Sequence, residues 1–85
     1  MTNKEFIKYW NNGATGGRSG HLRIEGENLI NYDTIIATKV EGGISLNSRY
    51  YSNTTSKIQN LIRGICNVVE EYEDDRSWDK WAYGM

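Results

Sequence analysis

The stretch RYYSNTTSKIQNLIR, residues 49–63, decides the fold because it joins the end of a β-rich segment to the start of the strongest helical pattern. Ser56 and Gln59 stand at the spacing of a capping box, in which a hydroxyl and an amide satisfy the first N–H groups of a helix. The spacing of the apolar residues predicts a helix over about residues 55–72. These residues are Ile58, Leu61, Ile62, Ile65, Val69 and Tyr72.

The hydroxyl side chains between Tyr51 and Lys57 have two interpretations. One is a surface that holds phosphate groups. The other is a junction where a strand ends and a helix begins, with Thr54 and Thr55 as rival caps to Ser56. Because Ser and Thr are preferred N-caps, we expect the second role.

Upstream of this junction, the segment of residues 28–52 is rich in β-branched and aromatic residues. Glu41-Gly42-Gly43 stands between two apolar residues and predicts a hairpin turn. Leu29 and Ile30 either extend a preceding strand or pack in a loop. The pattern predicts three strands, at about residues 21–25, 34–40 and 44–51.

The amino-terminal segment predicts a short helix over about residues 3–11, because Thr2 and Glu5 form a second capping box. The glycine-rich residues 13–20 predict a mobile loop, with an anion-binding nest as the alternative. We therefore expect one α+β domain over residues 1–85, in the order α-β-β-β-α. In it, one long helix packs on a three-stranded antiparallel sheet, the first helix closes one edge, and an acidic aromatic tail follows.

Composition excludes most chemistry. The 85 residues contain one cysteine, Cys66, and one histidine, His21, which are too few for a disulfide framework or a conventional zinc site. Neither has a partner nearby in sequence for nucleophilic catalysis. The chain has no apolar run long enough to span a membrane and no secretory signal at its start. We expect a cytosolic protein with no catalytic residues, metal or cofactor.

Charge divides the chain. Residues 1–63 carry eight Lys and Arg against five Asp and Glu, whereas residues 64–85 carry two against six. The acidic residues cluster at Glu70, Glu71, Glu73, Asp74 and Asp75, where the predicted long helix ends. Carboxylates are unfavourable at that negative pole, so helix stability does not explain them.

The acidic cluster has two interpretations, a solvated tail and a partner-binding surface. Clustered carboxylates can occupy the nucleic-acid groove of another protein. Trp78 and Trp81 follow the cluster and are either anchors for that partner or residues that fold back on the core.

A second candidate surface is the open face of the sheet. Arg23, Lys39 and Arg49, joined by Lys57 at the helix start, could contact nucleic acid there. An ordinary solvated sheet face is the alternative, because the chain as a whole is not basic.

Residues 22–62 resemble a set of small proteins encoded by phages and other mobile elements. The resemblance depends on Tyr-x-Thr-x-Ile-Ala at Tyr32–Ala37 and on Tyr-Ser-x-Thr-Thr-Ser-Lys at Tyr51–Lys57. These motifs mark a fold and imply no reaction or catalytic residues. In size and in strand-plus-helix organisation, the whole chain is also similar to small phage anti-CRISPR proteins, many of which block a CRISPR effector at its nucleic-acid site.

From these observations we expect a non-enzymatic inhibitor from a phage or mobile element. Its expected partner is a bacterial defence protein, a CRISPR effector, bound through Glu70–Asp75 with Trp78 or Trp81 as anchor. The alternative is a nucleic-acid-binding module that uses the sheet face.

Overall fold

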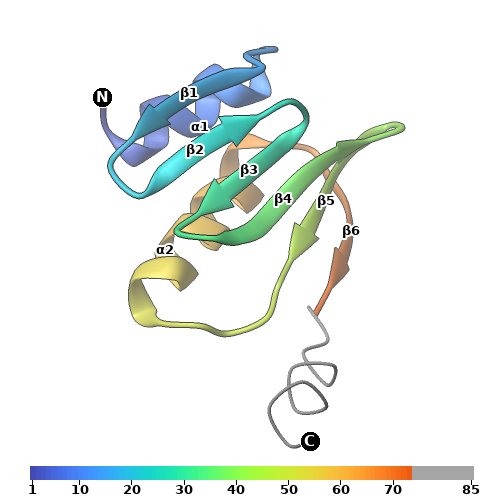
Figure 1. The fold of residues 1–85 in the computed structure, drawn as a ribbon. Helices are drawn as coiled ribbons and strands as arrows, with labels where there is room; N and C mark the ends of the chain where they lie inside the picture. The colour runs from blue at the N-terminus through green and yellow to red at the C-terminus, as the bar shows by residue number, and fades with distance from the viewer. Residues whose placement is uncertain (74–85) are drawn as a thin grey trace, which may run out of the picture.

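The computed structural model describes residues 1–73 and arranges them as two helices and one sheet (Figure 1). The helices are α1 (Asn3–Asn11) and α2 (Asn53–Ile65). The strands, in chain order, are β1 (Gly16–Ser19), β2 (Leu22–Glu25), β3 (Asn28–Asn31), β4 (Thr34–Val40), β5 (Gly43–Asn47) and β6 (Val68–Tyr72).

The sheet has six strands in the order in which they occur along the chain, β1-β2-β3-β4-β5-β6. Pairs from β1 to β5 are antiparallel, and β5 pairs with β6 in parallel. Parallel neighbours need a long crossover, which α2 supplies here. The fold is therefore α+β, but the prediction of a three-stranded antiparallel sheet is wrong because β1, β3 and β6 were not expected.

The first helix is confirmed. The Thr2 side chain accepts a hydrogen bond from the Glu5 backbone N–H at 3.1 Å, and the Glu5 carboxylate accepts one from the Thr2 N–H at 3.1 Å. This reciprocal capping box starts α1 where the sequence predicts it. The helix buries Phe6, Ile7 and Trp10 against the sheet and α2.

The three expected strands correspond to β2, β4 and β5, and the predicted hairpin turn joins β4 to β5 through Glu41 and Gly42. Strand β1 was missed because its glycine-rich sequence shows no apolar alternation, and most of it is exposed. Pairing with β2 alone makes it a strand. Strand β3 contains Leu29 and Ile30, which are both buried, and the two-residue turns that flank it left too little sequence for a clear pattern.

The second helix ends seven residues earlier than predicted, at Ile65 rather than residue 72. Cys66 takes an extended backbone conformation, and its N–H donates to Ile62 O at 2.8 Å as the last helical bond. The following Val68 and Val69 are β-branched and favour a strand. Their spacing also fits a helical stripe, which is why the pattern misled.

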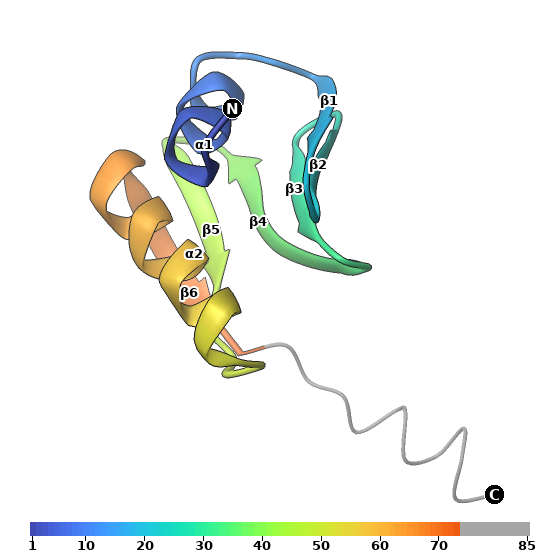
Figure 2. The ribbon, with the colours of Figure 1, turned by 90° about the vertical axis from the view of Figure 1, so that its left-hand side faces the viewer.

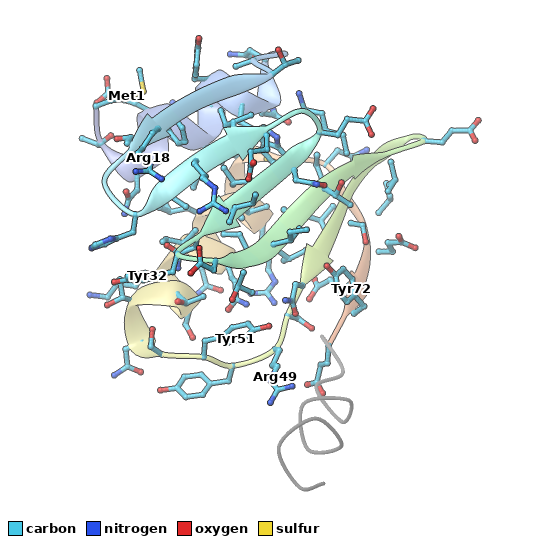
Figure 3. The ribbon with its side chains drawn as sticks, viewed as in Figure 1. Met1, Arg18, Tyr32, Arg49, Tyr51 and Tyr72 are labelled. Carbon is cyan, nitrogen blue, oxygen red and sulfur yellow. The ribbon has the colours of Figure 1, made fainter. Side chains whose placement is uncertain are left out.

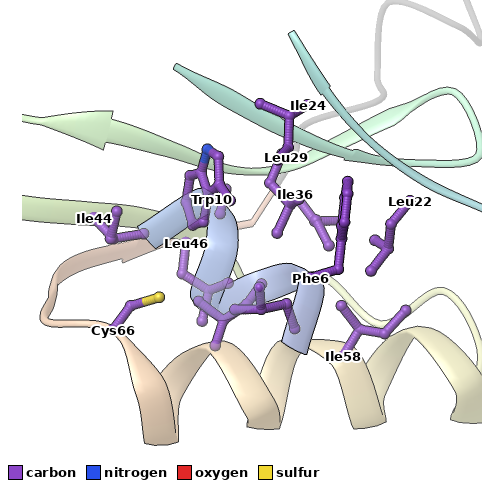
Figure 4. Close-up of a cluster of buried hydrophobic side chains, with 13 residues drawn as sticks. Phe6, Trp10, Leu22, Ile24, Leu29, Ile36, Ile44, Leu46, Ile58 and Cys66 are labelled. Atoms are coloured by element: carbon purple, nitrogen blue, oxygen red, sulfur yellow. The ribbon is translucent and has the colours of Figure 1, made fainter. Parts of the chain in front are cut away.

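Both helices lie on one face of the curved sheet, and the apolar side chains of all three meet between them (Figures 2 and 4). A register shift in the β3–β4 pairing turns two consecutive residues of β4, Ile36 and Ala37, into the core. The opposite face, here called the outer face, carries neither of the helices formed by residues 1–73. The core contains Phe6, Ile7, Trp10, Leu22, Ile24, Leu29, Ile36, Ala37, Ile44, Leu46, Ile58, Ile62 and Cys66.

Candidate functional site

The acidic residues Glu70 and Glu71 lie on strand β6 and not at the end of a helix. The expectation that these carboxylates lie at the negative pole of a helix is therefore wrong. Neighbouring positions of a strand point to opposite faces, so the two carboxylates point different ways. Glu71 stands beside Leu46, which faces the core, and Glu70 stands beside Ser45 on the outer face.

Glu71 has an internal partner. Its carboxylate oxygens accept hydrogen bonds from Arg63 Nη2 at 2.9 Å and Arg63 Nε at 3.3 Å. These bonds, together with the charge of the guanidinium, lower the pKa of Glu71. Arg63 also donates to Asn60 Oδ1 at 2.8 Å, so the guanidinium is held between α2 and β6. Glu71 therefore serves the fold and is the weakest candidate for binding an outside partner.

Glu70 and Glu73 differ from Glu71. Both are exposed, and neither forms a salt bridge within residues 1–73. The other residues predicted for this surface, Asp74, Asp75, Trp78 and Trp81, lie outside the described residues.

Among the described residues 1–73, strand β6 is an edge of the sheet, since it pairs there on one side only, with β5. Val69 is 49% exposed and Tyr72 is 39% exposed, so apolar surface lies next to Glu70 on this strand. We call β6 together with Glu73 the acidic edge. An open strand edge with mixed apolar and acidic side chains is a ready template for a protein partner.

The four basic residues predicted for the sheet face do not share one surface. Lys39 lies on the helix side, where its Nζ is 5.5 Å from the centre of the Trp10 ring, so the expectation that it points away from the helices is wrong. Arg23 is on β2, Lys57 is exposed on α2, and Arg49 follows β5, with its guanidinium 5.8 Å from the Tyr51 ring centre. Figure 3 shows Arg49 and Tyr51 together at the end of the molecule where β5 leads into α2.

The hydroxyl-rich junction before α2 is structural, as expected, although its cap is Ser52 and not Ser56. The Ser52 hydroxyl accepts a hydrogen bond from the Thr55 N–H at 3.1 Å. The buried Gln59 donates from Nε2 to the backbone oxygens of Asn47 at 2.7 Å and Arg49 at 2.9 Å. These bonds tie the end of β5 to the helix, so the motif mainly holds the crossover in place.

Two hollows flank Tyr32, and no pattern in the sequence predicts either of them. The first has a volume of about 240 Å³ and opens beside the turns β1–β2 and β3–β4. It is lined by Arg18, Gly20, His21, Arg23, Tyr32 and Asp33. The second, of about 210 Å³, lies between the β3–β4 turn and the start of α2. It is lined by Asn31, Tyr32, Thr34, Ile36, Tyr51, Ser52 and Thr55.

The histidine and the cysteine are far apart in the fold. His21 lies in the β1–β2 turn, and its ring stacks on Tyr32 with the centroids 4.3 Å apart. Cys66 belongs to the core between the sheet and α2. Burial raises the pKa of its thiol to about 11, against a smaller opposing effect of the Lys39 charge. A thiol so buried is a poor nucleophile at neutral pH.

Within residues 1–73, no group of three or more His, Cys, Asp and Glu side chains is arranged to hold a metal ion. In the same part of the chain, no helix has the length and apolar character needed to cross a membrane. No family model, curated protein or solved structure matches this chain. The charges and contacts of the chain's own side chains are therefore the basis for inferring its function.

Proposed function

We propose that this chain is a non-enzymatic inhibitor from a phage or mobile element that binds a bacterial defence protein, a CRISPR effector, through its acidic edge. The observation that carries the proposal is the edge position of β6, with Glu70 and Glu73 free of internal salt bridges in residues 1–73. The segment that follows adds Asp74 and Asp75, which bring further negative charge.

The chemistry of the acidic edge favours a basic partner. Charges that lack an internal counterion attract an oppositely charged surface over long range and increase the association rate. A channel that binds nucleic acid offers such a surface, because it is lined by Lys and Arg. Val69 and Tyr72 add apolar contact area, and the backbone of β6 offers hydrogen bonds to a partner strand. Trp78 and Trp81 remain the predicted anchors.

The test is inhibition of DNA cleavage by purified, guide-loaded CRISPR nucleases. The wild-type chain should inhibit at least one of them. The variant E70Q/E73Q/D74N/D75N should reach the same inhibition only at a concentration at least about tenfold higher. It lacks the negative charges that speed association with the nuclease and stabilise the complex. Its size and polarity stay nearly the same, so the fold should persist, as far-UV circular dichroism can check.

The matched control is Glu71→Gln. It removes one acidic charge from the same strand, but from a carboxylate that already pairs with Arg63. We expect little change in inhibition for this variant. A quadruple variant with full inhibitory activity, or a wild-type chain that inhibits no nuclease tested, would contradict the proposal.

A further inference from the structure

The outer face of the sheet brings two positive charges together. Arg18 on β1 stands directly opposite Arg23 on β2. Like charges at directly opposed positions of a sheet are destabilising. Arg23 is compensated, because it donates to Glu25 Oε2 at 2.9 Å, to Tyr32 O at 2.7 Å and to Asp33 Oδ1 at 3.4 Å. Arg18 is exposed and forms no salt bridge within the described residues, so its charge remains available to a ligand.

Tyr32 sits in a strained backbone conformation beside these arginines. Its φ of 57° is the one positive φ at a non-glycine position in residues 1–73. The other three hairpin turns of the sheet have glycine at their positive φ, at Gly20, Gly26 and Gly42. A bulky side chain in the left-handed region is unfavourable, and such strain is concentrated at functional sites. The turn thus holds an aromatic ring where glycine would fit without strain.

The ring of Tyr32 forms an exposed platform. It stacks on His21 at an interplanar angle of 18°, and the residue is still 54% exposed. His21 covers one side of the ring, so a further planar group would stack on the other side. Tyr32 lines both hollows, and Arg18 lines the first of them. Figure 3 shows Arg18 and Tyr32 on the same side of the molecule.

We propose that this platform binds a nucleotide unit, with the base stacked on Tyr32 and the phosphate held by Arg18. The pairing of these two groups carries the inference. An aromatic face stacks on any unpaired base, and a guanidinium makes paired hydrogen bonds to phosphate oxygens. Asp33, whose side chain is fully exposed, and Glu25 keep Arg23 neutralised, so binding is weak and depends mainly on Arg18.

Such a nucleotide unit has two sources, a free mononucleotide or a single-stranded nucleic acid. Adenosine monophosphate and a fluorescein-labelled oligothymidylate of about 12 nucleotides serve as the two probes, at about 50 mM salt. Fluorescence anisotropy reports binding of the oligonucleotide, and NMR shifts of the His21 and Tyr32 ring protons report binding of the mononucleotide. Tighter binding of the oligonucleotide indicates the strand, and equal binding indicates the free nucleotide.

Two variants test the two roles separately. Arg18→Gln should weaken oligonucleotide binding about tenfold and reduce its dependence on salt by about one ion. Tyr32→Asn keeps a residue that tolerates positive φ, and it should weaken binding about tenfold with an unchanged salt dependence. Lys8→Gln is the matched control, because it removes an exposed charge from α1 on the other side of the sheet.

Three results would overturn the proposal. The first is no binding of either probe at low salt. The second is oligonucleotide binding that both Arg18→Gln and Tyr32→Asn leave at the wild-type level. The third is equal affinity for a duplex of the same length, since a paired base cannot stack on the ring.

Discussion

The acidic edge and the Tyr32 platform lie in differently built parts of one sheet. Tyr32 lies in the two-residue turn between β3 and β4, which are each paired on both sides, and Arg18 lies on β1, which pairs only with β2 in residues 1–73. Within the described part of the chain, the acidic edge is paired on one side only, and Arg63 of α2 bonds one of its carboxylates.

This difference teaches which ligand each surface suits. The Tyr32 ring is held in a tight turn between two doubly paired strands and stacks on His21, so it is preorganised for a small planar group that needs a fixed face. An open strand with exposed Val69 and Tyr72 can adapt to the shape of a protein partner and add hydrogen bonds along its length.

The largest effect should come from Gln59, whose side chain is 3% exposed and bonds two backbone carbonyls. Gln59→Ala leaves both carbonyls without these donors, and we expect a loss of about 2–3 kcal/mol in the free energy of unfolding. Urea denaturation measures it. Lys57→Ala, at an exposed position of the same helix, should change the stability little. Equal effects of the two substitutions would show that the Gln59 bonds do not hold the crossover.

Gly43→Ala should damage the acidic edge alone. A Cβ at Gly43 would collide with Asn67 O and with Val69 Cγ1, so β6 must shift. We expect a loss of about 1–3 kcal/mol, with faster hydrogen exchange in β6 than in β2 and β3.

Gly64→Ala is the matched control for that substitution, because its Cβ meets nothing within 4 Å and lies in α2. It should stabilise the protein by about 0.5–1 kcal/mol, since alanine is the better helix former. If the β6 amides exchanged equally slowly in both variants, the close approach of β6 to Gly43 would not be what positions this strand.

Backbone strain at Tyr32 predicts that glycine is more stabilising than alanine at this position, the reverse of the order in a helix. Tyr32→Gly and Tyr32→Ala lose the same ring, but only alanine keeps a Cβ at positive φ. The glycine variant should be the more stable by about 1 kcal/mol. The same pair of substitutions at Lys57 in α2 should favour alanine by about 1 kcal/mol. Thermal denaturation of the four variants measures the stability difference between glycine and alanine at each position. If alanine were the more stable residue at both positions, the backbone at Tyr32 would not be strained.

The smallest effect concerns pH. Because the pKa of Glu71 is lower in the folded protein, its pair with Arg63 stabilises the fold above the ordinary carboxyl pKa of 4.5. That contribution is lost as the pH falls through the lowered pKa. The melting temperature of Glu71→Gln should therefore fall less than that of the wild type below about pH 4.5. The melting temperature of Glu70→Gln should follow that of the wild type. If the melting temperatures of all three proteins fell in parallel, the Glu71–Arg63 pair would not be the source of this pH dependence.

Local signals predicted α1 and the turn between β4 and β5. The capping box of Thr2 and Glu5 fixes the start of α1 by side-chain bonds three residues apart, and sequence spacing shows such bonds directly. The Glu41-Gly42 turn was also predicted from residues that are adjacent in the sequence. Strand β6 was not, because Val69 and Tyr72 fit helical spacing, and only pairing with β5 makes that segment a strand.

The candidate sites were less predictable, because they depend on neighbours that are distant in sequence. The acidic cluster was visible, but strand alternation on β6 is what places Glu71 beside Arg63 and turns Glu70, which has no salt bridge within residues 1–73, to the other face. Arg18 was placed in a loop, so its position opposite Arg23 could not be inferred. The positive φ of Tyr32 leaves no signal in the sequence, since tyrosine rarely adopts it.

The most direct test of the central claim is competition for the nucleic-acid site of the effector. Labelled target DNA bound to a guide-loaded CRISPR nuclease would be titrated with the protein, and fluorescence anisotropy would report its displacement. The wild type and Glu71→Gln should displace the DNA at similar concentrations, and E70Q/E73Q should need several times more, about threefold to tenfold. Identical midpoints for all three proteins, or DNA that stays bound throughout, would contradict binding through the acidic edge.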